Sequence, residues 1–315
     1  MKKLILLFLL VHFLWTGNVS SQCLPEGITF TVQSQIDNFQ MDYPGCTKIL
    51  GDVTILESYS GAISNLNGLS ILNSIDGTLE INQNNGLTDL SGLNNLDSIG
   101  GDLKIGLCHS LTNLNGLQNL SFVGGGLILW YDELVSNLDS LENLCFIGDY
   151  LIIGELESLN SLYGLGNIDT IGYLEIYQNA SLTNLIGLEK LSVIEGNFKL
   201  DHNDSLINLS GLDSLNSIEG YFRIENNYYL TNLNGLENLT NIGGDLVIGT
   251  YFGGHLYLTS LTGLESLTTI GGSLSITHND SLQTISSLNN LVSIGYDLSI
   301  YYNYSLIPII SQDYR

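Results

Sequence analysis

Residues 230–249, LTNLNGLENLTNIGGDLVIG, hold the pattern that most constrains the fold of this chain. An aliphatic residue stands at every third position from Leu230 to Ile242, and a Gly-Gly-Asp turn then leads into the alternating pair Leu246 and Ile248. A spacing of three matches neither a long helix nor a long strand, and it indicates a chain that turns corners around a narrow core. The same frame recurs about every 24 residues, which predicts one coil of a solenoid per repeat.

Each repeat is expected to open with a short strand that alternates inward and outward, as in Leu79-Glu80-Ile81. The fold class predicted is therefore mainly β: a right-handed parallel β-helix, or leucine-rich-repeat-like solenoid, of about 11 coils. The strands are expected to start at Val53, Leu79, Leu103, Leu127, Leu151, Leu174, Phe198, Phe222, Leu246, Leu274 and Leu298.

Two polar or small residue types recur at fixed places in the repeat. An asparagine five residues past the strand start is expected to bond backbone groups of the adjacent coil and so form an asparagine ladder; it is found at Asn84, Asn179, Asn203, Asn227, Asn279 and Asn303. A glycine before the third leucine is expected to mark a corner with positive φ; it is found at Gly68, Gly92, Gly116, Gly164, Gly187, Gly211, Gly235 and Gly263.

The chain before the repeats divides into two segments. Residues 1–21 combine Lys2 and Lys3 with a short apolar stretch and small residues before Gln22, which predicts a secretory signal peptide. Residues 22–50 are expected to form an N-terminal cap, with one helix of about three turns and a disulfide between Cys23 and Cys46. Residues 51–315 are then the repeat solenoid.

Charge and cysteine content narrow the function classes. The formal net charge of −24 disfavours nucleic acid as a partner, and no stretch after the signal peptide has the ~18 apolar residues of a membrane span. Four cysteines suit an oxidising compartment, so the protein is expected to be secreted or displayed on the cell surface. Cys108 and Cys145 are equally compatible with buried thiols and with a second disulfide.

The motif GDLVI, the asparagine turn and the following SLxxLxGLxxLxxIGG resemble the receptor L-domain version of leucine-rich repeats, especially that of secreted and surface proteins from Bacteroidetes. The opening ITFTVQSQIDNFQMDYPGCTKILGDVTI is also similar to the start of such proteins. The resemblance implies a solenoid used for recognition or adhesion, with no shared catalytic residues. It therefore implies a non-enzymatic protein without a cofactor.

No constellation of catalytic or metal-ligating residues emerges from the sequence. His202 and His278 hold equivalent turn positions but lie three coils apart, too far to share a metal ion. The cations expected on strands, Lys104, Lys199 and Arg223, are predicted to pair with Glu80 and Glu175 of neighbouring coils. The alternatives to a recognition protein are a polysaccharide-active β-helix enzyme and a passive spacer of the cell surface.

A candidate ligand patch is expected where the outward strand positions become apolar and aromatic. Trp130 lies between Gly106 and Gly154 at equivalent positions, which leaves room for its indole to lie flat. Such a patch on an acidic solenoid predicts a site for a protein or glycan ligand. Its residues are Ile128, Trp130, Tyr150, Ile152, Tyr173 and Tyr177.

The last repeat begins at Leu298 and is followed by Leu306 and Ile309, with no recognisable C-terminal cap. The sequence leaves open three explanations for the missing cap. The chain is a fragment of a longer protein, it caps itself imperfectly, or it pairs end to end with another copy.

Overall fold

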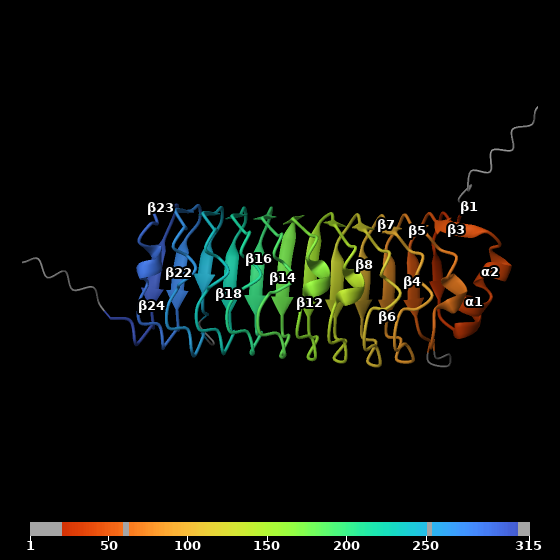
Figure 1. The fold of residues 1–315 in the computed structure, drawn as a ribbon, viewed down its shortest axis with the longest axis horizontal. Helices are drawn as coiled ribbons and strands as arrows, with labels where there is room; N and C mark the ends of the chain where they lie inside the picture. The colour runs from red at the N-terminus through yellow and green to blue at the C-terminus, as the bar shows by residue number, and fades with distance from the viewer. Residues whose placement is uncertain (1–20, 59–62, 251–253, 308–315) are drawn as a thin grey trace, which may run out of the picture.

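The computed structural model describes residues 21–58, 63–250 and 254–307. Three all-parallel β-sheets form a solenoid of stacked coils (Figure 1). The expected signal peptide lies outside the described residues except for Ser21. The repeat that begins at Leu246 is four residues longer than most, and residues 251–253 of this insertion also lie outside the described residues.

The largest sheet has 12 strands, and each long strand pairs with its counterpart one coil away. All the strand starts expected from the repeat are confirmed to within one residue. The strands are β2 (Ile28–Phe30), β4 (Val53–Leu56), β6 (Leu79–Asn82), β8 (Leu103–Gly106), β10 (Leu127–Trp130), β12 (Tyr150–Gly154), β14 (Tyr173–Tyr177), β16 (Phe198–Asp201), β18 (Phe222–Glu225), β20 (Leu246–Ile248), β22 (Leu274–Thr277) and β24 (Leu298–Tyr301).

Two sheets of six short strands run along another edge of the coils. The first contains β1 (Ser21–Cys23), β3 (Cys46–Ile49), β5 (Ser74–Ile75), β7 (Ser98–Ile99), β9 (Phe122–Val123) and β11 (Phe146–Ile147). The second contains β13 (Thr170–Ile171), β15 (Val193–Ile194), β17 (Ser217–Ile218), β19 (Asn241–Ile242), β21 (Thr269–Ile270) and β23 (Ser293–Ile294).

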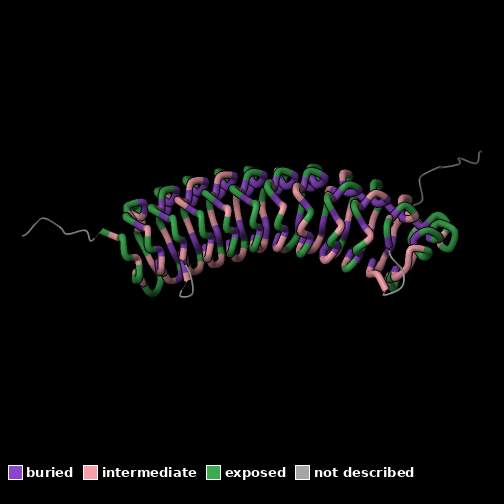
Figure 2. The backbone as a smooth tube through the Cα atoms, turned by 90° about the horizontal axis from the view of Figure 1, so that it is seen from below, coloured by how far each residue is buried: buried purple, intermediate pink, exposed green. Residues whose placement is uncertain are grey.

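A single apolar core runs through all the coils. In the repeat that starts at Leu230, every aliphatic residue at the three-residue spacing, through Leu246 and Ile248, is 0% exposed. Because each coil leaves its upper and lower surfaces apolar, neighbouring coils must stack to remove those surfaces from water. The stack bends into a shallow arch (Figure 2).

The glycine corners are only partly as expected. Six of the eight have positive φ, but Gly68 and Gly164 are absent from that set. They lie in 3-10 helices η1 (Asn67–Leu69) and η3 (Tyr163–Leu165), two of four such turns with η2 (Asp139–Leu141) and η4 (Ser286–Leu288). A 3-10 turn needs negative φ, so the prediction was wrong for these two positions.

At the N-terminal end the expected single helix is replaced by two short ones, α1 (Gln33–Asp37) and α2 (Phe39–Asp42). The chain breaks at Asn38, because Asp and Asn are poor helix formers. Ile36 and Phe39 are both fully buried against the first coil, and Gln33 Oε1 accepts the Ser64 N–H at 2.8 Å. Cys23 and Cys46 form the predicted disulfide.

Candidate functional site

The structure brings the six predicted patch residues together on β10, β12 and β14. We call this surface the aromatic face: Ile128, Trp130, Tyr150, Ile152, Tyr173 and Tyr177. Ile128 lies beside Ile152, Tyr150 lies beside Tyr173, and Trp130 and Tyr177 flank Gly154. All six side chains are partly exposed, because they point away from the core at alternate strand positions.

Three rings of the aromatic face lie flat against glycines of the preceding coil. A Cβ atom on Gly106 would run into the Trp130 indole, one on Gly126 into the Tyr150 ring, and one on Gly154 into the Tyr177 ring. Each ring therefore covers backbone with one face and presents the other outward. The expected space for Trp130 is present on the Gly106 side, whereas Tyr177 takes the space over Gly154.

Hydrogen bonds fix two of the tyrosines. Tyr150 Oη donates to Asp102 Oδ2 at 2.7 Å, two coils away, and Tyr173 Oη donates to Glu175 Oε2 at 2.6 Å. Burial, followed by the bond to Asp102, raises the pKa of Tyr150 to about 12, and burial raises that of Tyr173 as well. Both hydroxyls therefore keep their protons at neutral pH and remain donors.

Ion pairs flank the aromatic face on both sides. Lys104 Nζ lies 2.9 Å from Asp102 Oδ2, and Lys199 Nζ lies 3.2 Å from both Glu175 Oε1 and Asp201 Oδ2. Burial raises the pKa of Asp102, but bonds from the Gly126 N–H, Lys104 and Tyr150 more than offset it, so its pKa lies below 3.8.

The pairing prediction was correct for Lys199 and wrong for Lys104. The partner of Lys104 is Asp102, which directly precedes the same strand, and not Glu80 of the neighbouring coil. Glu80 instead accepts a bond from Asn82, at 3.2 Å. Arg223 lies 4.8 Å from the centre of the Tyr221 ring, in a cation–π contact that the sequence analysis did not predict.

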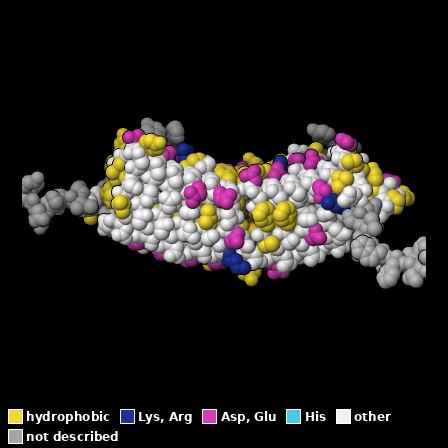
Figure 3. All heavy atoms as spheres, turned by 90° about the horizontal axis from the view of Figure 1, so that it is seen from above, with side chains coloured by type: hydrophobic (Ala, Val, Ile, Leu, Met, Phe, Trp, Pro, Cys, Tyr) yellow, Lys and Arg dark blue, Asp and Glu magenta, His cyan; other side chains and the backbone are white. Residues whose placement is uncertain are grey.

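A second apolar cluster lies on the short strands β9 and β11. Phe122 and Phe146 stack with ring centres 4.9 Å apart, and they are 40% and 47% exposed. Hydrophobic side chains gather near the middle of the face seen in Figure 3, the side of the molecule that carries β5 and β7 in Figure 1. Sequence reasoning missed this pair, since it tracked only the residues around the long strands.

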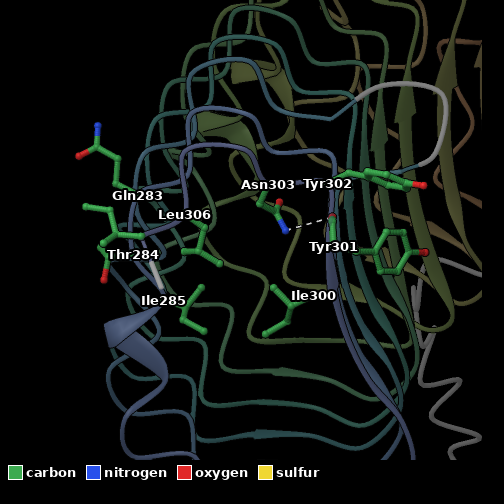
Figure 4. Close-up of a pocket in the computed structure, with 9 residues that line it drawn as sticks. Gln283, Thr284, Ile285, Ile300, Tyr301, Tyr302, Asn303 and Leu306 are labelled. Carbon is green, nitrogen blue, oxygen red and sulfur yellow. Dashed lines mark hydrogen bonds between the residues drawn. The ribbon is translucent and has the colours of Figure 1, made fainter. Parts of the chain in front are cut away.

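A cavity of about 700 Å³ lies at the C-terminal end of the stack (Figure 4). Ile285, Ile300 and Leu306 point into it. The equivalent residues one coil earlier, Leu261 and Ile276 among them, are fully buried. The cavity is thus the core position that a further layer of side chains would fill, and it is separate from the aromatic face.

His202 and His278, at equivalent turn positions, each contact a neighbour in their own part of the solenoid. His202 Nδ1 contacts Asp201 Oδ1 at 2.7 Å, and the His278 ring packs 4.8 Å from that of Tyr302. Across residues 21–58, 63–250 and 254–307, no three His, Cys, Asp or Glu side chains are grouped to hold a metal ion. Cys108 and Cys145 are free thiols, the first buried and the second exposed, which resolves the alternative left open by the sequence.

Residues 45–106 match the family model of the receptor L domain. The matched segment and the all-parallel solenoid together support a receptor L-domain-like fold, and this non-enzymatic family suggests a receptor-like, ligand-binding role. No curated protein and no solved structure gives a significant match. In the part of the chain that the structure describes, no helix has the length and apolar character to cross a membrane.

Proposed function

We propose that this chain is a secreted or cell-surface recognition protein that binds a protein or glycan ligand through the aromatic face. The observation that carries the proposal is the set of three rings seated on glycines of the preceding coil. A ring held in this way loses little conformational entropy when a ligand covers it, and buried aromatic residues supply much of the binding energy at interfaces.

A protein ligand is the first candidate because the matched family is receptor-like. A glycan is the second, since outward ring faces beside fixed donors and acceptors suit a sugar ring, with its apolar C–H groups and polar rim. Here Tyr150 Oη, Lys104 and Glu175 would supply the polar contacts.

The test is a glycan array combined with capture of partners from cell surfaces, using the mature chain and a Trp130→Ser/Ile152→Ser double variant. Val247→Ser is the matched control, because Val247 holds the same outward position on β20, away from the aromatic face. The double variant should fold normally and lose the captured ligand, and the control should retain it. Unchanged binding by the double variant would refute the proposal.

The two alternative functions make different predictions. A polysaccharide-active enzyme would release products from polysaccharides. A passive spacer would capture no ligand in either assay. We expect binding without turnover.

We also propose end-to-end self-association through the C-terminal end of the solenoid. Val292, Tyr296 and Leu298 are 85%, 80% and 58% exposed there, beside the cavity lined by Ile300. Residues 281–307 carry one charged group, Asp297, so this end escapes the repulsion that the acidic surface imposes elsewhere. Sedimentation should detect a dimer that Tyr296→Glu/Leu298→Glu abolishes; a monomer at all concentrations would contradict the idea.

A further inference from the structure

The buried asparagine ladder sets a chemical rule for each of its positions. Asn203 is 0% exposed; its Oδ1 accepts the Asn179 backbone N–H at 3.2 Å, and its Nδ2 donates to the Ile176 carbonyl at 2.8 Å. A polar side chain at such a position can therefore offer one acceptor and one donor toward the preceding coil, whereas Leu156 fills its position with an apolar side chain. From β6 to β24 the positions are filled by Asn84, Cys108, Asp132, Leu156, Asn179, Asn203, Asn227, His255, Asn279 and Asn303.

His255 shows that a different side chain can meet the same rule. Its Nδ1 accepts the Asn227 backbone N–H at 3.2 Å, and its Nε2 lies 3.0 Å from the Ile224 carbonyl oxygen. These two bonds together need a neutral imidazole with its proton on Nε2; Nδ1 also lies 3.1 Å from the Asn227 carbonyl oxygen, a contact that serves a ring protonated on Nδ1. Burial lowers the pKa of His255, which keeps the ring in that neutral form.

Asp132 is the position at which the rule requires an extra proton. It is 1% exposed, and its Oδ1 accepts the Cys108 backbone N–H at 2.6 Å, as asparagine Oδ1 does elsewhere. By the register of β10 with β8, the carbonyl on the donor side is that of Ile105, the counterpart of Ile176. An ionised carboxylate offers that carbonyl only lone pairs, whereas a carboxylic acid can donate to it.

We propose that Asp132 is a proton-binding site within the core, and that it completes the ladder only as the neutral carboxylic acid. Loss of its proton leaves a buried anion facing the Ile105 carbonyl oxygen with no hydrogen atom between the two acceptors, and this weakens the turn that follows β10. At lower pH the acid takes the place that the asparagine amide holds in other coils.

The groups around Asp132 favour the neutral acid. The pKa of Asp132 is raised from 3.8 to about 6, mainly by burial and to a lesser extent by Glu133. The Cys108 N–H and His109 lower this pKa, but by less. His109 Nδ1 and Glu133 Oε2 lie 3.1 Å apart and are largely exposed, so each screens the other. Burial also raises the pKa of the Cys108 thiol, to about 12, which keeps it neutral. In the following coil, Glu155 interacts with Tyr131.

The direction of the pH effect follows from the raised pKa. The folded state holds the proton more tightly than the unfolded chain, so stability is complete below about pH 4, falls as pH rises toward 6, and is constant above. A difference of about two pH units corresponds to roughly a hundredfold change in the local opening equilibrium.

This site lies two residues after Trp130, which belongs to the aromatic face. Any effect of the proton on ligand binding rests on the proposed function, whereas its effect on local stability does not. The two can therefore fail separately.

The test is native-state hydrogen exchange on the whole chain at pH 5 and pH 8, corrected for the intrinsic pH dependence of exchange. Asp132→Asn supplies the ladder amide, and Asn203→Asp is the reciprocal variant. Protection near Cys108 and Asp132 should fall by roughly tenfold between the two pH values in the parent chain, because part of the full effect is already lost at pH 5, and it should stay level in Asp132→Asn. Asn203→Asp should acquire the same loss near Asn179.

Two results would overturn the proposal. One is an Asp132→Asn variant that keeps the parent's local pH dependence or is less protected than the parent at pH 8. The other is an Asn203→Asp variant without pH-dependent protection near Asn179, and this outcome decides the matter even if Asp132→Asn does not fold.

Discussion

Replacing Asn203 by alanine should open the middle of the solenoid far more than removing an equally short bond at the surface. Asn203→Ala deprives the buried Asn179 N–H of its acceptor and the Ile176 carbonyl of a donor. The matched control is Asn238→Ala. Asn238 is exposed, and its Nδ2 donates to the Asp213 carbonyl at 2.7 Å.

The magnitudes follow from burial. The Asn179 N–H is left unsatisfied, at about 1–3 kcal/mol, and the Ile176 carbonyl loses one of its two bonds, at about 0.5–1.5 kcal/mol, so Asn203→Ala should lower the local free energy of opening by about 2–4 kcal/mol. At Asn238, water replaces the lost bond, and the cost should be about 0.5–1 kcal/mol. Both asparagines donate through Nδ2 to a carbonyl of the preceding coil, at 2.8 Å and 2.7 Å, and they differ in burial and in the additional bond that Asn203 accepts.

Hydrogen exchange is the appropriate assay, because a long repeat array need not unfold in a single step. The Asn179 amide should exchange at least about 30-fold faster in Asn203→Ala, whereas Asn238→Ala should change exchange less than about tenfold. Equal effects of the two substitutions would refute the idea that the ladder is held by satisfaction of buried groups. Loss of all protection throughout the chain would show that coil stability cannot be resolved locally.

Two further perturbations test other parts of the reasoning. His255→Asn should remove an acid-side loss of stability: the lowered pKa of His255 means that its contribution is complete above about 6.5 and is lost as pH falls, so the melting temperature of the variant relative to the parent should rise from pH 7.5 to pH 5. An unchanged difference would contradict the neutral-ring assignment. Gly106→Ala should displace the Trp130 indole, shift its fluorescence and cost about 1–3 kcal/mol. Gly166→Ala is the control, because the nearest atom to its added Cβ, Tyr163 O, is 3.5 Å away; equal spectra for the two variants would contradict the flat seating of the ring.

The candidate surface could be located from sequence because strands of equal spacing stack in register. Once Leu127 and Leu151 were assigned inward, the alternation of the strand placed Ile128, Trp130 and Ile152 outward and side by side. The links between more distant coils could not be read in this way. Tyr150 bonds to Asp102 across two coils, and Lys104 pairs with Asp102 rather than with Glu80. These contacts depend on the rotamer of each side chain, which the repeat pattern does not specify.

The buried titratable residues show a similar division. The asparagine ladder is recognisable in the sequence because asparagine recurs at a fixed repeat position. Asp132 and His255 differ from asparagine, so the recurrence did not include them. Asp132 stands five residues past Leu127 and could have been counted, whereas its burial and its bond to Cys108 came from the structure; His255 is shifted by the extra residues that precede it, so only the structure places it in the ladder.

The amino-acid sequence alone determined the length of the repeat and the aliphatic residues that point inward. It therefore determined the solenoid, because each coil must bury the same repeat positions against its neighbours. It also determined which side chains face out along the long strands. The tertiary structure decided the local details. It determined that the helix is interrupted at Asn38, and that Gly68 and Gly164 lie in 3-10 turns instead of positive-φ corners. It also determined which polar groups form hydrogen bonds or ion pairs between coils. Those details depend on packing distances and desolvation of individual atoms, which a repeat pattern does not contain.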